Sequence, residues 1–211
     1  MQLRLFDTVN PDPITEEGAA PQFRSLIDAR AGGSSSTRSF IYMSFTDQGL
    51  QKRDLSDEAA FTSLDWDIAL RRYVLRLNSG VSGPSCVEAA RTAPGTSFDA
   101  LTQVPANLSW RTEEYFTPPA MAGGMCTYVP DTSGIGAPGT ALSSFWTYQN
   151  CVQMTGNVYV VRTRTGRYVK LQVLSYYSPT EQDTCDTMST VPAQNSAALV
   201  RIRWGFIAPP P

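Results

Sequence analysis

The stretch NVYVVRTRTGRYVKLQVLSYY, residues 157–177, predicts a β-hairpin. Polar and apolar side chains alternate on both sides of Thr165-Gly166, and a strand points successive side chains to opposite faces. Gly166 can adopt the positive φ that a tight turn needs. One face of the hairpin is therefore expected to pack on a core, and the other to be partly exposed to solvent. The last two residues, Tyr176 and Tyr177, raise the question of whether the hairpin also borders a binding site.

The composition of the whole chain also favours an all-β protein. Only 17% of the 211 residues are charged, and the 15 glycines and 15 prolines are typical of a chain rich in turns. This length fits a single domain built as an antiparallel β-sheet or sandwich. Residues 31–39, AGGSSSTRS, predict a flexible linker. We therefore expect residues 1–38 to be an N-terminal extension and residues 39–211 to form the all-β domain.

Three further segments are predicted to be strands. Residues 40–45, FIYMSF, indicate a buried strand, and residues 196–206 indicate a final one. Residues 63–80, SLDWDIALRRYVLRLNSG, alternate with period two, but the apolar residues change face halfway. We interpret this as a strand with a bulge or a strand that moves between sheets, with a helix as the alternative. Residues 117–139 form a Gly/Pro-rich loop whose length is typical of functional or disordered segments.

The sequence excludes the commonest kinds of catalytic site. It contains no histidine, so Ser-His-Asp and Cys-His arrangements are impossible. The glycine motifs that bind phosphates or dinucleotides are also missing. Its acidic pairs, such as Glu113-Glu114, are adjacent in sequence, so on a strand the two carboxylates diverge instead of facing one cleft. A net charge of −2 indicates no basic surface for nucleic acid. We therefore expect a protein that is not an enzyme.

The cysteines are more consistent with disulfides than with a metal. Four are present, none of them in a CxxC pair: Cys86, Cys126, Cys151 and Cys185. An all-cysteine zinc site from such scattered residues is the alternative. Two disulfides in an exported protein are favoured, and 3 pairings are possible. Of these we favour Cys126–Cys151 with Cys86–Cys185, because the first bridge would close one long loop.

The sequence predicts no membrane-spanning segment. No stretch approaches the ~18 consecutive apolar residues that a membrane helix needs. The first residues, MQLRLFDTVNPDPITEEG, lack the apolar core of a signal peptide. For an exported protein, we therefore expect that this is the mature part of the chain with Met1 added. A lipid anchor would then have been removed together with the signal.

Several of these segments together resemble one protein family. FIYMSF at residues 40–45 is followed by WDIAL at residues 66–70 and NSG at residues 78–80, and the hairpin follows at residues 158–177. In this order and spacing, over residues 39–207, the chain resembles the HmuY family of haem-binding proteins. The resemblance implies an all-β fold whose long loops grip haem. It also implies a secreted or outer-membrane protein, often a lipoprotein, that captures haem and passes it to a TonB-dependent receptor.

The missing histidines separate this chain from the best-known members of that family. Those members hold haem iron between two histidines, whereas some relatives use two methionines, whose thioethers are soft iron ligands. The resemblance therefore points to Met154 together with either Met121 or Met125 as iron ligands, and to Tyr128 and Tyr148 as further haem-binding candidates. Met43 is assigned to the core and Met188 to a polar loop. The alternative is a binding or interaction module of the same fold that has lost haem binding.

Overall fold

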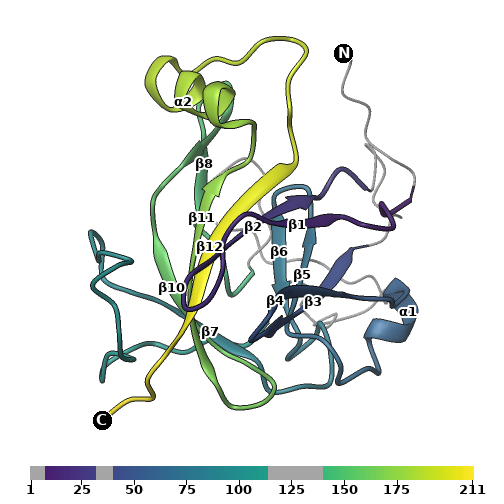
Figure 1. The fold of residues 1–211 in the computed structure, drawn as a ribbon, viewed down its shortest axis with the longest axis vertical. Coiled ribbons are helices and arrows are strands. Elements are labelled where there is room, and N and C mark those ends of the chain that lie inside the picture. The colour runs from purple at the N-terminus through teal and green to yellow at the C-terminus, as the bar shows by residue number, and fades with distance from the viewer. Residues whose placement is uncertain (1–7, 32–39, 114–139) are drawn as a thin grey trace, which may run out of the picture.

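The computed structural model describes residues 8–31, 40–113 and 140–211 (Figure 1). Within them strands far outnumber helices and pair in antiparallel sheets, which confirms the all-β prediction. The strands are β1 (Ile14–Glu16), β2 (Phe23–Asp28), β3 (Ile41–Thr46), β4 (Gly49–Arg53), β5 (Ile68–Arg71), β6 (Val74–Leu77), β7 (Glu88–Arg91), β8 (Trp146–Tyr148), β9 (Val152–Met154), β10 (Val158–Arg162), β11 (Tyr168–Ser175) and β12 (Leu199–Ile207). The helices are α1 (Asp57–Ala60) and α2 (Pro179–Met188).

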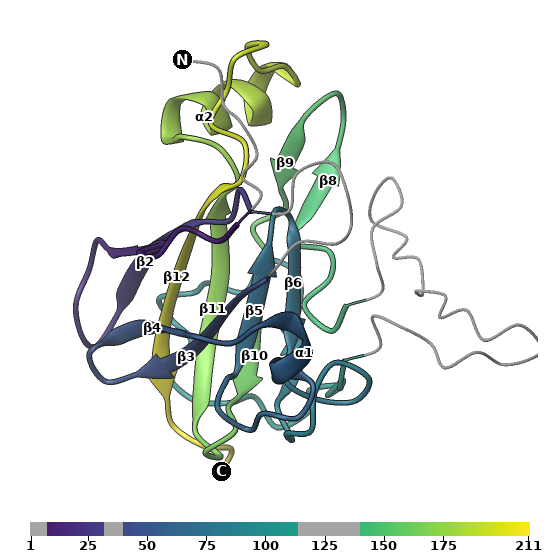
Figure 2. The same cartoon turned by 90° about the vertical axis from the view of Figure 1, so that its right-hand side faces the viewer.

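The strands form two large antiparallel sheets and one small hairpin. One sheet has the order β1-β2-β12-β11-β10-β7, the other β4-β3-β5-β6, and β8 pairs with β9 alone. The two large sheets face each other around the main core (Figures 1 and 2). Trp204 of β12 shows this packing: its ring stacks on Phe23 at 4.4 Å between centroids and meets Phe45 of the other sheet at 4.9 Å. The β8–β9 hairpin and α2 project together from one end of the sandwich (Figure 2).

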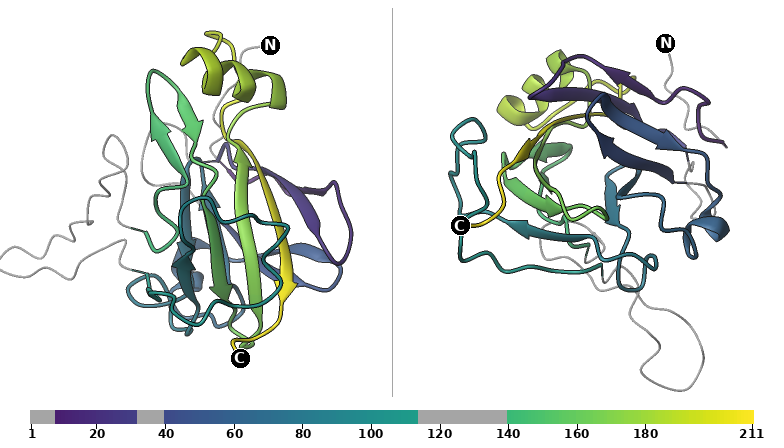
Figure 3. Two further views of the ribbon diagram at one scale, coloured as in Figure 1. Left: turned by 90° about the vertical axis from the view of Figure 1, so that its left-hand side faces the viewer. Right: turned by 60° about the horizontal axis from the view of Figure 1, so that its bottom comes forward.

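The predicted hairpin is confirmed as β10 and β11. The two strands pair from Val158 with Gln172 to Arg162 with Tyr168, and Gly166 in the turn has φ +78°. The other face, expected to be partly exposed to solvent, is exposed at Arg162 but largely covered elsewhere. Val158 and Val160 on the outer face are buried by the segment that follows β7, which crosses the strands in Figure 3 (left). The same segment also buries Lys170, whose Nζ donates to the carbonyl oxygen of Phe98 at 2.8 Å.

Residues 63–80 do not form one long strand or a helix. They contain the hairpin of β5 and β6, in which Arg71 pairs with Val74 across a two-residue turn. Arg72, the first residue of the turn, has φ +52°. Arg71 and Val74 are three positions apart, yet they pair directly and so share a face of the sheet. The turn therefore shifts the alternation by one residue, and the change of apolar face marks a chain reversal. The interpretation as a bulge or a strand that moves between sheets is wrong.

The segment that the sequence assigns to an N-terminal extension contributes two strands to the large sheet. β2 pairs with β12 from Asp28–Leu199 to Phe23–Trp204, and β1 pairs with β2. Phe23 and Ile27 belong to the main core. Residues 31–39, which have the composition of a linker, separate these strands in sequence from the strands with which they pair. For this reason the sequence analysis did not assign them to the β-domain. No helix in the described residues is long and apolar enough to span a bilayer.

A buried carboxylate ties the two large sheets together. Asp67, just before β5, is 2% exposed. Its Oδ2 accepts the N–H of Phe45 at 3.1 Å, and its Oδ1 accepts the N–H of Arg164, in the β10–β11 turn, at 2.9 Å. Burial raises the pKa of Asp67, while the two backbone hydrogen bonds and the charge of Arg164 oppose that rise. One side chain thus joins β3 of one sheet to the hairpin of the other.

Candidate functional site

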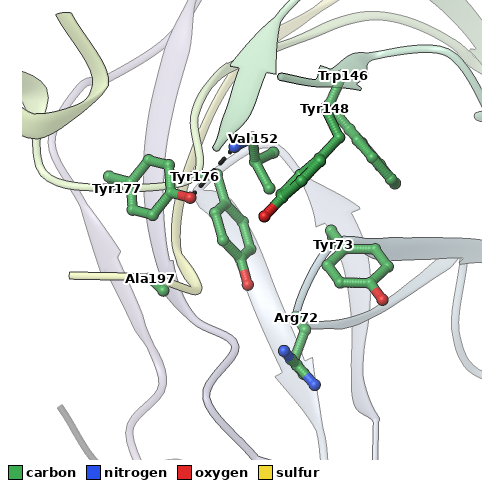
Figure 4. A pocket seen from close by; sticks show the side chains of 8 residues that line it. All are labelled: Arg72, Tyr73, Trp146, Tyr148, Val152, Tyr176, Tyr177 and Ala197. Atoms are coloured by element: carbon green, nitrogen blue, oxygen red, sulfur yellow. Dashed lines mark hydrogen bonds between the residues drawn. The ribbon is translucent and has the colours of Figure 1, made fainter. Parts of the chain in front are cut away.

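A pocket of about 360 Å³ lies where the β5–β6 turn, the β8–β9 hairpin and the end of β11 meet (Figure 4). A volume of this order is typical of small-molecule sites. The residues that line it come from four separate segments of the chain: Arg72, Tyr73, Trp146, Tyr148, Val152, Tyr176, Tyr177 and Ala197. We call this the aromatic pocket, because five of these eight side chains are tyrosine or tryptophan.

The aromatic rings hold one another at edge-on and tilted angles. The Tyr73 ring lies 5.0 Å from that of Trp146 and 6.2 Å from that of Tyr176, and Tyr176 lies 5.0 Å from Tyr177. Trp146, Tyr176 and Tyr177 are buried, whereas Tyr148 at the rim is 45% exposed. Rings packed in this way present large, rigid apolar surfaces. The pocket is therefore suited to a flat ligand that is mostly apolar.

A network of hydrogen bonds from α2 fixes two walls of the aromatic pocket. Oε1 of the buried Gln182 accepts the backbone N–H of Tyr176 at 2.8 Å and that of Tyr177 at 3.3 Å. Nε2 of Gln182 donates to the carbonyl oxygen of Val152 at 3.0 Å. The Tyr177 hydroxyl accepts the N–H of Val152 at 3.2 Å, which is the dashed line in Figure 4. The amide of Gln182 and the hydroxyl of Tyr177 therefore position the β9 wall and the tyrosine wall relative to each other.

A disulfide joins the β8–β9 hairpin to α2, but not in the predicted pairing. Cys151, next to Val152, is bonded to Cys185. Both bridges that the sequence analysis favoured, Cys126–Cys151 and Cys86–Cys185, are therefore wrong. The sequence analysis did not predict the helix at residues 179–188, although Ser178, Pro179 and Glu181 form a helix-start signature, and this helix brings Cys185 beside the hairpin. Cys86 is an exposed free thiol among the described residues, and Cys126 lies outside them.

Of the predicted ligands, Met154 lies beside the aromatic pocket. Met154 pairs with Trp146, and Val152 pairs with Tyr148, across the β8–β9 hairpin. Directly opposed residues in an antiparallel pair share a face, and residues two apart along a strand do so as well. The half-buried Met154 is therefore on the same face of the hairpin as the three pocket residues that β8 and β9 supply. The sequence-predicted Tyr148 is itself part of the lining.

The other candidates are placed elsewhere or fall outside the described residues. Met121, Met125 and Tyr128 belong to the segment that the structure does not describe. Met43 is fully buried in the core, as predicted. Met188 is 66% exposed at the end of α2, so it belongs to a helix and not to a loop. Within the described residues, no group of three or more acidic or cysteine side chains could hold a bare metal ion.

The electrostatics of the aromatic pocket are dominated by one cation. Burial raises the pKa of Tyr176 to about 12, so its hydroxyl is neutral at ordinary pH and cannot act as an anionic ligand there. Burial also raises the pKa of Tyr177. Among the described lining residues, only Arg72 carries a formal charge. Near neutral pH the pocket is therefore an apolar aromatic space with a positive charge at one edge.

The sequence reasoning missed most of the lining. Arg72 and Tyr73 were assigned to the middle of a strand, and Trp146 was not singled out. The signal that was present is the aromatic pair Tyr176-Tyr177, which directly follows β11 and supplies one wall.

The chain matches one protein family by sequence, and solved structures share its fold. A family model described as HmuY protein matches residues 36–188. A candidate lipoprotein from Bacteroides fragilis NCTC 9343 has the same fold, with a TM-score of 0.52 and 16% identity over 95% of both chains. A candidate HmuY-like haem-binding protein from Bacteroides vulgatus ATCC 8482 also has a TM-score of 0.52 and 16% identity, over 97% of both chains. No curated protein matches the sequence.

Proposed function

This chain belongs to the HmuY family, and from that premise we propose that it binds haem as a capture protein. The observation that carries the proposal is the aromatic pocket, with Met154 on the same face of the β8–β9 hairpin as the pocket residues. A tetrapyrrole is a flat and mostly apolar ring, so one edge of it suits a space walled by aromatic side chains. A thioether beside such a space can reach a metal at the centre of the ring.

Methionine, in place of the family's histidines, is proposed to hold the iron. Met154 supplies one ligand, and either Met121 or Met125, in the Gly-rich loop, supplies the other. Thioether ligands are soft and favour ferrous over ferric iron more than histidine does. The neutral hydroxyl of Tyr176 leaves the thioether of Met154 as the better ligand on this side of the pocket.

The proposed cellular role is the one that the resemblance to the HmuY family implies. The chain would act outside the cytoplasm, secreted or held at the outer membrane by a lipid anchor, and would pass haem to a TonB-dependent receptor. The β-domain would be the haem-binding unit. The similarity of its fold to a candidate lipoprotein supports this location.

Titration of the purified protein with haemin, followed by dithionite, is expected to produce a shifted Soret band that is stronger in the ferrous state. Met154→Ala should weaken ferrous haem binding by about tenfold or more, equivalent to about 1.4 kcal/mol, because one of the proposed iron ligands is lost. Met121→Ala and Met125→Ala, tested separately, should show which of the two provides the second ligand.

Met188→Ala is the matched control, because this exposed thioether lies outside the pocket and its loss should leave the spectrum unchanged. The absence of any Soret shift with wild-type protein in both redox states would reject haem binding. The fold would then serve as a binding module for another ligand. An unchanged spectrum with Met154→Ala would reject the ligand assignment alone.

A further inference from the structure

The last residue of β9 is held from outside its hairpin by a side chain of α2. Within the hairpin, the N–H of Thr155 donates to the carbonyl oxygen of Phe145 at 3.1 Å, and pairs of this kind alternate with pairs that share no backbone hydrogen bond. Met154 and Trp146, one step along the strands, therefore form a pair without such bonds, and the N–H of Met154 points away from β8. Oδ1 of Asp186, on α2, accepts this N–H at 3.0 Å. The helix thus satisfies a donor that the hairpin leaves unused.

The carboxylate of Asp186 is itself fixed by neighbouring residues of α2. Nε2 of Gln182, four residues earlier, donates to the same Oδ1 at 2.9 Å. Gln182 is buried, and it also bonds to both walls of the aromatic pocket. Cys185, next to Asp186, is bonded to Cys151 of the hairpin, and α2 and the hairpin project together in Figure 2. The carboxylate therefore has a defined position relative to β9.

A methionine ligand depends on its backbone more than a histidine ligand does. A histidine that binds a metal through one ring nitrogen donates a hydrogen bond from the other nitrogen, and this bond fixes the ring. A thioether has no donor and is only a weak acceptor, so no comparable bond orients it. The position of Met154 then depends on the packing of its half-buried side chain against the main core and on the bond from its N–H to Asp186.

We propose that Asp186 is a positioning residue that acts through Met154. By holding the N–H of Met154, the carboxylate keeps the thioether on the face of the hairpin that also carries the pocket residues of β8 and β9. The proposal rests on the proposed function, because only a ring that contains iron has a use for the thioether. Loss of Asp186 should therefore weaken the bond to the metal and leave the contacts with the porphyrin ring intact.

Ferrous haem and iron-free protoporphyrin IX separate these two effects, because both have the same ring. Asp186→Ala is expected to weaken the binding of ferrous haem about threefold, as expected for the loss of one hydrogen bond, and to reduce the shift of its Soret band. The affinity for protoporphyrin IX, measured by quenching of tryptophan fluorescence, should be unchanged. A residue that only supported the pocket wall would alter the affinity for both ligands.

Three further variants separate the hydrogen bond from general effects. Asp186→Asn keeps an acceptor oxygen and should restore most of the affinity for ferrous haem. Asp183→Ala removes another exposed carboxylate of α2, one with no bond to the hairpin among the described residues, and should bind both ligands like wild type. The double variant Met154→Ala/Asp186→Ala should bind ferrous haem no more weakly than Met154→Ala, because Asp186 acts only through that thioether.

The outcomes distinguish this inference from the proposed function. If Met154→Ala weakens the binding of ferrous haem and Asp186→Ala does not, iron ligation stands and the role of Asp186 is overturned. Equal weakening of haem and protoporphyrin IX binding in Asp186→Ala would also overturn that role, as would additive losses in the double variant. The absence of a Soret shift with wild-type protein in both redox states would overturn both.

Discussion

Replacing Asp67 with alanine is expected to lower the free energy of unfolding by about 3–5 kcal/mol. The carboxylate accepts the backbone N–H groups of Phe45 and Arg164, and its removal would leave both without that partner at the junction of the two sheets. Arg164 would also lose an anion 4.0 Å from its Nε. Urea denaturation, followed by tryptophan fluorescence, measures the loss.

Asp47→Ala is the matched control for Asp67→Ala. Asp47 pairs with Arg167 at 2.7 Å, but its side chain is 68% exposed. An exposed ion pair contributes little to stability, so this variant should unfold close to the wild-type midpoint. Asp67→Asn keeps one acceptor oxygen and should lie between the two. Equal losses for Asp67→Ala and Asp47→Ala would show that the buried carboxylate does not hold the sheets together.

Removing the Cys151–Cys185 disulfide is expected to have two effects. The double variant Cys151→Ala/Cys185→Ala should lose about 3 kcal/mol of stability, because the bridge closes a loop between residues 34 positions apart. It should also bind porphyrin more weakly, since Cys151 is adjacent to Val152 in the pocket wall and Cys185 lies on the helix that carries Gln182. Reduction of wild-type protein with dithiothreitol should reproduce both effects.

A control on the same helix separates the bridge from the helix itself. Thr187→Ala alters an exposed residue of α2 and should leave stability and porphyrin binding within error of wild type. Loss of stability without loss of porphyrin affinity in the double variant would mean that the disulfide stabilises the fold but does not position the pocket. Unchanged unfolding would contradict the expected contribution of the bridge itself.

Local alternation predicted the hairpin of β10 and β11 but could not show what covers it. Val158 and Val160 alternate with the core residues Tyr159 and Val161, yet both sets are buried, because a segment distant in sequence packs on the outer face. At residues 63–80 the alternation led to a wrong prediction, a single strand with a bulge or a strand that moves between sheets. The tight turn at Arg72-Tyr73 contains no glycine or proline, so the chain reversal shows in the sequence only as the change of apolar face.

The candidate site could be predicted only in part for the same reason. Of the candidates predicted from the sequence, Tyr148 lines the aromatic pocket, and Met154 lies outside the lining but on the same face of the β8–β9 hairpin; their role in binding stays a prediction. Tyr73 was not identified, because its ring meets that of Tyr176 only after two hairpins have folded. The helix α2 was missed because its sequence, PTEQDTCDTM, has almost no apolar face, and Cys185 and Gln182 are its buried residues.

Gln182 bonds to both walls of the aromatic pocket, so we expect the pocket to open cooperatively. The amides of Tyr176 and Tyr177 donate to Gln182, and that of Val152 donates to the Tyr177 hydroxyl. Their hydrogens should therefore exchange with deuterium in one common opening step, with a single opening free energy. Gln182→Leu should speed all three together, whereas three different rates in the wild type would contradict the linkage. Such a pocket opens and closes as a unit, so its ligand would leave in one event and not by gradual loosening.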